Sequence, residues 1–174
     1  ELAKMRSFAD KLDVQYRYDS ILWPRVDGSQ TPFKYQIPLE DLIEFDEKEP
    51  ERQEESSRLA ELAKERKLRY NYVYHCGAGL TSFHINSAVK ISICIMSRQP
   101  AYDILKNGFE HGWEKIGELR KLKTQMDTQC RACSIRGYCM QCPGWSQLVH
   151  NDNETPVAFI CDLAHLLTAQ TVKV

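Results

Sequence analysis

Seven cysteines are the residues of this sequence best suited to chemistry, because they fall into a pair, a tight run and one final position. They are Cys76, Cys94, Cys130, Cys133, Cys139, Cys142 and Cys161. The third to the sixth follow the spacing C-x2-C-x5-C-x2-C. Two thiolates separated by two residues can bind one metal centre while the amides between them donate hydrogen bonds to the sulfurs. The pattern therefore predicts a thiolate-bound metal or iron–sulfur centre.

The residues between and after these cysteines add to the prediction. The amides of Arg131 and Ala132, and those of Met140 and Gln141, are the expected donors to the sulfurs. Pro143 directly follows the run, and a proline after the last cysteine is typical of bacterial ferredoxins. We expect it to stop a helix there and to turn the chain away from the centre.

Composition narrows the class of protein. An odd number of cysteines leaves one thiol without a disulfide partner, which argues against a disulfide framework. The 174 residues, 43% of them hydrophobic, allow one modest domain or a small domain with an arm. A net charge of −1 gives no global field for nucleic acid or an anionic membrane. No apolar run comes near the roughly 18 residues of a membrane span and no secretory leader is recognisable, which predicts a cytoplasmic location.

The first 70 residues are expected to hold few regular elements. Residues 1–12 have the apolar spacing of an amphipathic helix, and residues 14–24 alternate in the manner of a strand. Residues 30–50 contain three prolines and predict a linker with a short helix near 38–42. Residues 51–68 are highly charged with a narrow apolar stripe, which predicts a solvent-exposed connector helix.

The second half is expected to hold the elements that position the cysteines. Residues 82–85 and 89–93 predict a β-hairpin, and residues 103–108 predict a turn. Helices are expected over 109–125 and from about 157 onward. The predicted class is therefore α+β, with a small β-hairpin, helices and long cysteine-bearing loops.

This order of features resembles the SPASM domain, the C-terminal auxiliary iron–sulfur domain of radical S-adenosylmethionine enzymes that mature peptides and proteins. The resemblance covers residues 71–165 and includes Cys76-Gly77-Ala78-Gly79, Phe83-His84-Ile85, Gly108-Phe109-x3-Trp113 and Cys161-x3-His165. The sequence departs from the family pattern twice. Val89 stands where the family usually has a hairpin glycine, and the run ends in C-x2-C, one residue shorter than the common form.

The resemblance implies two [4Fe-4S] clusters and assigns their ligands. Cluster I would be held by Cys76, Cys94 and Cys142. Cluster II would be held by Cys130, Cys133, Cys139 and Cys161. Because cluster I has only three cysteines, it would take a further ligand or leave one iron open to substrate. His75 and His84 are the nearest candidates for that extra ligand in the sequence.

The resemblance also implies a function and a domain order. The chain would transfer electrons, position a substrate, or do both, while a peptide or protein, with or without a leader peptide, is modified. The C-x3-C-x2-C motif of the cluster that cleaves S-adenosylmethionine does not occur. We therefore expect this chain not to be catalytic alone, with S-adenosylmethionine bound by a radical S-adenosylmethionine barrel missing from it. Residues 1–50 are similar to the last helix–strand unit of such a barrel, followed by a connector at 51–70 and the cluster-binding domain at 71–174.

Two other interpretations of the same residues stay open. The first is a structural zinc module without a redox role, in which Cys130, Cys133, Cys139 and Cys142 form one tetrahedral site. The second is a domain that binds a peptide or another partner through the exposed helix and the edge of the hairpin. Neither interpretation predicts nucleic acid or a membrane as a partner.

Overall fold

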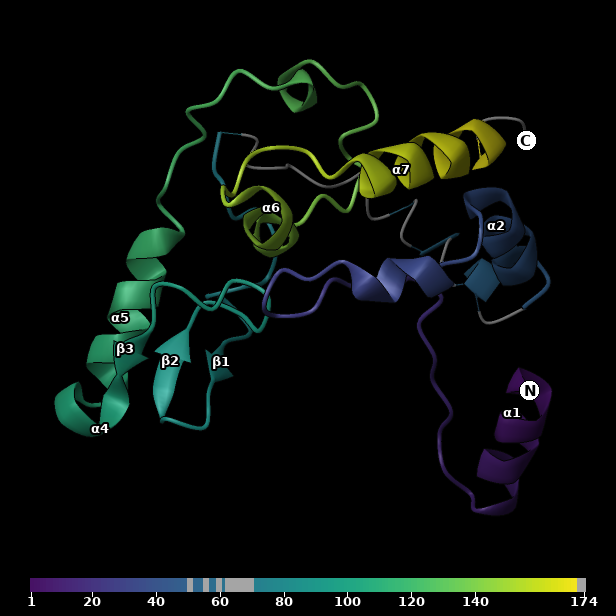
Figure 1. Ribbon diagram of the computed structural model, residues 1–174, viewed down its shortest axis with the longest axis horizontal. Coiled ribbons are helices and arrows are strands. Elements are labelled where there is room, and N and C mark those ends of the chain that lie inside the picture. Colours follow the sequence, from purple (N-terminus) through teal and green to yellow (C-terminus); the bar gives the residue numbers. More distant parts are fainter. Residues whose placement is uncertain (50–51, 55–56, 59–60, 62–70, 172–174) are drawn as a thin grey trace.

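A computed structural model describes residues 1–49, 52–54, 57–58, 61 and 71–171. It combines helices with a small antiparallel sheet, which confirms the α+β class (Figure 1). The α-helices are α1 (Leu2–Lys11), α2 (Leu39–Glu47), α4 (Ile104–Asn107), α5 (Phe109–Leu119), α6 (Pro143–His150) and α7 (Ala158–Thr171). The 3-10 helices are η1 (Thr31–Tyr35) and η2 (Gln129–Arg131), and the strands are β1 (His84–Ile85), β2 (Lys90–Ser92) and β3 (Tyr102–Asp103).

The sheet has the order β1-β2-β3, and both pairs are antiparallel. The predicted hairpin is confirmed, with His84 opposite Ser92 in the register of β1 and β2. Its turn is closed by a hydrogen bond of 2.9 Å from the Val89 N–H to the Asn86 carbonyl. Val89 takes the left-handed backbone conformation at φ 54°, which a β-branched residue rarely adopts. The backbone at Val89 is therefore strained.

The prediction of a simple turn at 103–108 is wrong, because these residues form the end of β3 and the short helix α4. The Asp103 carboxylate starts α4 by accepting a hydrogen bond of 3.0 Å from the Lys106 N–H. Gly108 ends the helix at φ 84°, a conformation that glycine adopts at little cost. Asp103 and Gly108 thus cap a short helix that the spacing of apolar residues does not predict.

Helix α5 packs on the sheet and forms the main core, which consists of Val73, Tyr74, Ala78, Ile91, Ile93 and Ile116. Ile91 of β2 and Ile116 of α5 are fully buried. Gly112 lets the helix approach the strand closely, since a Cβ there would lie 2.5 Å from Cγ2 of Ile91. Each buried aliphatic side chain contributes about 1.5–3 kcal/mol. This core fixes the hairpin that lies between Cys76 and Cys94 in the sequence.

Two smaller cores join the N-terminal segment to α6 and α7. Leu42 and Ile43 of α2 pack against Leu163 of α7, and α2 lies beside α7 in Figure 1. Trp145 of α6 is 1% exposed, and its ring lies 4.6 Å from that of Trp23 between centroids. The residues predicted as an arm and linker therefore pack on the C-terminal part, and the domain boundaries at 50 and 70 stay predictions.

The predicted strand at 14–24 is wrong, although the predicted helix at 1–12 is confirmed as α1. Residues 14–19 have no regular secondary structure. Side chains take the backbone donors that a strand ladder would use. The Ile21 N–H donates to the Asp19 carboxylate at 3.0 Å, and the Leu22 N–H donates to the Gln36 amide oxygen at 2.8 Å. The alternation of apolar and polar residues was therefore not sufficient to predict a strand here.

The other helix predictions differ in their bounds. The short helix expected near 38–42 is the longer α2, whereas α5 ends at Leu119 rather than near 125. The last helix is confirmed as α7, and α6 was not predicted. Of the connector helix expected over 51–68, residues 52–54, 57–58 and 61 are helical, and the rest lies outside the described residues. None of the helices in the described part of the chain is long and apolar enough to cross a membrane.

Candidate functional site

All seven cysteines are free thiols, and charge interactions divide them into two groups. Cys142 interacts with Cys94 and Cys76, and we call these three the first thiol group. Cys139 interacts with Cys130, Cys161 and Cys133, and we call these four the second thiol group. The structure therefore brings together cysteines from positions 76 to 161 in two neighbouring sets.

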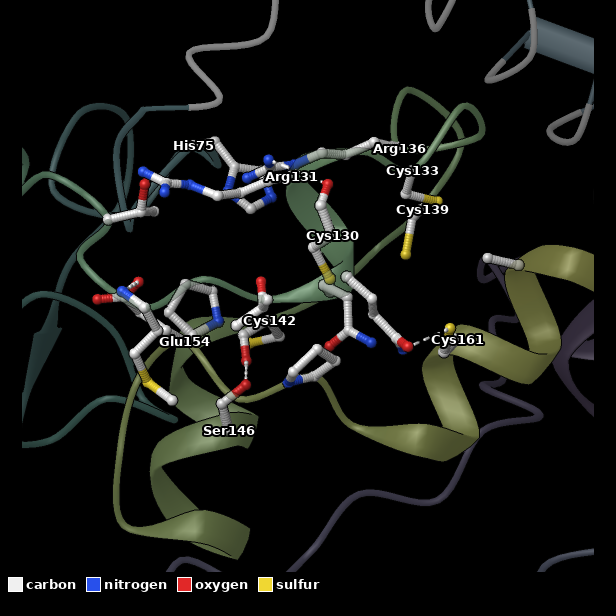
Figure 2. Close-up of a pocket in the computed structure, with 18 of the residues that line it drawn as sticks. His75, Cys130, Arg131, Cys133, Arg136, Cys139, Cys142, Ser146, Glu154 and Cys161 are labelled. Carbon is white, nitrogen blue, oxygen red and sulfur yellow. Dashed lines mark hydrogen bonds between the residues drawn. The ribbon is translucent and has the colours of Figure 1, made fainter.

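The second thiol group lines a cavity of about 570 Å³. Cys130 comes from η2, Cys133 and Cys139 from the loop after it, and Cys161 from the first turns of α7. Figure 2 shows these four cysteines around the cavity, which Cys142 also lines. The cavity therefore holds all the thiols of the second group and one of the first.

Burial and mutual repulsion set the electrostatics of the second thiol group. Burial raises the pKa of the Cys139 thiol, the backbone of Gln141 acts in the opposite direction, and Cys130, Cys161 and Cys133 raise it further. Burial likewise raises the pKa of Cys161, with added contributions from Cys130, Asp162 and Cys133. Several thiolates so close together repel one another, and a bound cation would relieve that repulsion.

Cys142 lies at the N-cap of α6, and Pro143 occupies the first helical position. Our expectation that Pro143 stops a helix is wrong, because here it begins one, a position that suits its fixed φ. Burial raises the pKa of the Cys142 thiol, and the backbone N–H groups of Trp145 and Gly144 oppose that effect. Since a helix N-terminus carries partial positive charge, α6 favours a thiolate at this place.

Cys94 follows β2 and accepts a hydrogen bond on its sulfur from the Ser97 N–H at 3.1 Å. The Ser97 side chain is fully buried and shares a hydrogen bond of 2.7 Å with the Tyr74 hydroxyl. Burial raises the pKa of Tyr74, the bond with Ser97 lowers it, and Cys94, Cys76 and Cys142 raise it. Tyr74 thus holds in place the segment that carries a donor to Cys94.

A close backbone approach brings Cys142 beside Cys94. Gly144 of α6 lies against the segment that follows Cys94, and a Cβ at Gly144 would lie 2.6 Å from Cβ of Met96 and 2.9 Å from the Ser97 nitrogen. Real Cβ atoms essentially never come so close to other heavy atoms. Only glycine therefore lets the N-terminus of α6 reach the loop after β2.

The two histidines predicted as extra ligands lie in different places. His75 lines the cavity with Cys142 (Figure 2). Its Nδ1 lies 3.3 Å from the Val73 carbonyl. His84 belongs to β1, and its buried Nε2 has no hydrogen-bond partner within the described part of the chain. His165 also lines the cavity, four residues after Cys161 in α7. Of the two predicted histidines, His75 alone lines the cavity.

The thiols do not converge on a single point. Among the residues that the structure describes, no three His, Cys, Asp or Glu side chains are placed to hold a metal ion. One tetrahedral ion needs its ligands within about 2.3 Å of itself. A [4Fe-4S] cluster binds each thiolate through a different iron and therefore keeps its ligands farther apart. The described residues therefore hold no preformed site for a single metal ion.

Sequence reasoning found the thiols but missed most of the groups around them. The Arg131 N–H was predicted to donate to a cysteine sulfur, but it donates to the Thr128 carbonyl at 3.0 Å. The Gln129 side chain reaches the Cys161 sulfur at 3.8 Å, and Arg136 donates to the Cys130 carbonyl at 3.2 Å. The position of Arg136 within the cysteine run could have identified it from the sequence. No feature of the sequence marks the Ser97 N–H as a donor to Cys94.

No protein-family model, no curated protein and no solved structure matches this chain.

Proposed function

We propose that this chain is an auxiliary cluster-binding domain of a radical S-adenosylmethionine maturase. Cluster I would be bound by the first thiol group and cluster II by the second, each as a [4Fe-4S] centre. Such centres supply one-electron transfer, and an iron without a protein ligand can bind a substrate. The partners would be a peptide or protein substrate and the barrel that binds S-adenosylmethionine.

One observation carries this proposal. Besides burial, the pKa of Cys142 is raised by Cys94 and Cys76, and that of Cys139 by Cys130, Cys161 and Cys133, which are the sets of three and four that the resemblance to the SPASM domain implies. Seven cysteines can be divided in many ways, and adjacent residues of the run would be the simplest set. Instead Cys142 interacts with Cys94 and Cys76, while Cys139 interacts with the distant Cys161.

The surroundings of the sulfurs support an iron–sulfur role. Donors from Ser97 to Cys94 and from the Gln141 backbone to Cys139 are of the kind that tunes a cluster's potential. Trp145, fully buried in the core beside Cys139 and Cys142, excludes water from this side of the thiols. A low-polarity surrounding with few donors is a means by which proteins set the redox potential.

The first thiol group has one ligand too few for a [4Fe-4S] cluster, which is the basis for a role in substrate positioning. His75 lines the cavity with Cys142 and is the better placed of the two predicted extra ligands. Cys76 itself is exposed, so a substrate can reach this group from solvent. We propose that cluster I takes either His75 or a substrate group in the fourth position.

The zinc alternative is less well supported. It needs Cys142 to join Cys130, Cys133 and Cys139 at one ion. The charge interactions of Cys142 are instead with Cys94 and Cys76. A peptide-binding role is compatible with the cluster proposal, because a substrate must also be held.

Cysteine variants from each group test this proposal. Cys94→Ala and Cys133→Ala are reconstituted anaerobically with iron and sulfide, and each product is analysed for metal and by EPR after reduction. Each variant is expected to keep about four irons, half of the content of two [4Fe-4S] clusters, and to lose a different EPR signal. Retention of all the iron by both variants, or zinc without sulfide in the unaltered chain, would contradict it.

A further inference from the structure

A buried arginine contacts the loop that carries Cys76. Arg120 follows the last residue of α5 and is 9% exposed. Its guanidinium donates a hydrogen bond of 2.7 Å to the Cys76 carbonyl and a second one to the Ala78 carbonyl. Gly79, at φ 68°, lies in the same loop, and a Cβ there would lie 2.9 Å from Cγ1 of Ile93 and 3.4 Å from Cδ of Arg120. The loop is shaped around a positive charge.

Within the part of the chain that the structure describes, this charge has no anionic partner. Over the described ranges of the chain, no Asp or Glu forms an ion pair with Arg120, although other arginines such as Arg6 and Arg52 do form them. An isolated buried charge is strongly unfavourable unless it is paired. The two carbonyls and the negative end of the α5 dipole offset part of this penalty. A nearby anion is needed to offset the rest of the free-energy cost of burying this charge.

We propose that Arg120 is the counter-ion of the anionic centre held by the first thiol group. This inference rests on the proposed function, since it needs a thiolate-bound cluster beside Cys76. Reduction of that cluster adds one negative charge to it, and a desolvated positive charge nearby stabilises the reduced state. Arg120 therefore raises the reduction potential of cluster I.

The second thiol group has a weaker counterpart. Arg136 donates to the carbonyl of Cys130, the first cysteine of that group, at 3.2 Å. Arg136 is only partly buried, so water screens its charge more than that of Arg120. The arginine at each group thus contacts the carbonyl of the first cysteine, but the electrostatic effect is expected to be larger at cluster I.

The test separates the charge of Arg120 from its hydrogen bonds. Arg120→Gln keeps a donor and removes the charge, whereas Arg120→Lys keeps the charge and removes the planar fork. Lys121→Gln is the matched control, because it removes the same charge from the next residue, which is exposed. Each protein is reconstituted with iron and sulfide and titrated with dithionite as the electron donor, while EPR follows both clusters.

Arg120→Gln is expected to lower the ratio of reduced to oxidised cluster I about tenfold at a fixed potential, equivalent to about 59 mV for one electron. Arg120→Lys and Lys121→Gln are expected to leave the ratio close to that of the unaltered chain. If Arg120→Gln does not retain cluster I, retention of its iron in Arg120→Lys supports the charge. Equal behaviour of the Gln and Lys variants, or of Arg120→Gln and Lys121→Gln, would overturn the inference.

The result is distinguishable from a failure of the proposed function. Iron and sulfide in the unaltered chain decide whether the clusters form at all. If two clusters form and the Arg120 variants do not differ, the proposed function stands and the role of Arg120 falls. If the unaltered chain binds no iron, both fall.

Discussion

Replacing Gly144 by alanine tests how the first thiol group is assembled. The added Cβ would lie 2.6 Å from Cβ of Met96, 2.9 Å from its carbonyl carbon and 2.9 Å from the Ser97 nitrogen. Two of these three atoms belong to the backbone, so a side-chain rotation cannot relieve the contact. The N-terminus of α6 must therefore move away from the loop after β2, and Cys142 must move with it.

The magnitude follows from two opposing effects. Overpacking of a tightly packed core costs about 1–3 kcal/mol. Alanine gains at most about 1 kcal/mol over glycine in a helix, and less in the first turn, where Gly144 lies. We expect the free energy of unfolding to fall by roughly 1–2 kcal/mol. Because the first thiol group loses its geometry, we also expect the iron content after reconstitution to fall by about half.

Gly117→Ala is the matched control for this change. Gly117 lies within α5, and a Cβ there would meet nothing within 4 Å. This variant is expected to raise the free energy of unfolding by about 0.5–1 kcal/mol and to keep all the iron. Urea denaturation measures the stability of both variants, and metal analysis measures the iron. A Gly144→Ala protein as stable and as rich in iron as the control would show that the close approach of α6 to Met96 does not position Cys142.

Three further predictions follow from individual contacts. Tyr74→Phe is expected to lower the free energy of unfolding by about 1–3 kcal/mol in urea denaturation, because it leaves the buried Ser97 hydroxyl without its 2.7 Å partner. Val89→Gly is expected to raise it by roughly 0.5–1 kcal/mol, since the left-handed conformation at φ 54° costs valine more than glycine's extra chain entropy. Burial acts to raise the pKa of Asp152, but hydrogen bonds, first of all that from the Thr155 hydroxyl, outweigh it and hold the pKa lowered. The folded-state pKa lies below the unfolded one, so this stability is present above about pH 4 and is lost as the pH falls through the folded value. Asp152→Asn should therefore flatten the acid limb of the stability curve.

Each of these predictions has a matched control and a contrary outcome. Tyr138→Phe changes an exposed tyrosine and should leave stability unaltered, so equal losses in both variants would count against the Tyr74 argument. Ala88→Gly alters the same turn at a residue that has no positive φ, and it should not stabilise. For Asp152, an unchanged acid limb, or an equal change in Asp127→Asn at an exposed site, would exclude the proposed hydrogen bonds as its cause.

The parts predicted from the sequence are those with a strong local pattern. Helices α1 and α7 follow from apolar spacing, and the hairpin of β1 and β2 follows from two apolar runs joined at Asn86. Helix α6 was missed because Cys142 and Pro143 were interpreted as the end of a helix, although proline is equally suited to the first position. The strand at 14–24 failed because side-chain hydrogen bonds replace a partner strand.

In the candidate site, too, only the residues with a strong local pattern could be predicted from the sequence. The thiols are visible in the sequence because cysteine has few other uses in such a spacing. The groups that hold them in place are tertiary contacts that no local pattern reveals. Gly144 matters only because the chain at Met96 lies against it, and Arg120 matters only because the loop at Cys76 folds over it.

The iron and sulfide content of the unaltered chain tests most directly whether the seven thiols bind two iron–sulfur clusters. The chain is reconstituted anaerobically in the presence of iron, sulfide and zinc, and an EPR spectrum is taken after reduction. We expect about eight irons with matching sulfide and two overlapping EPR signals. Zinc that remains through reconstitution, without uptake of sulfide, would contradict it and indicate a structural metal module.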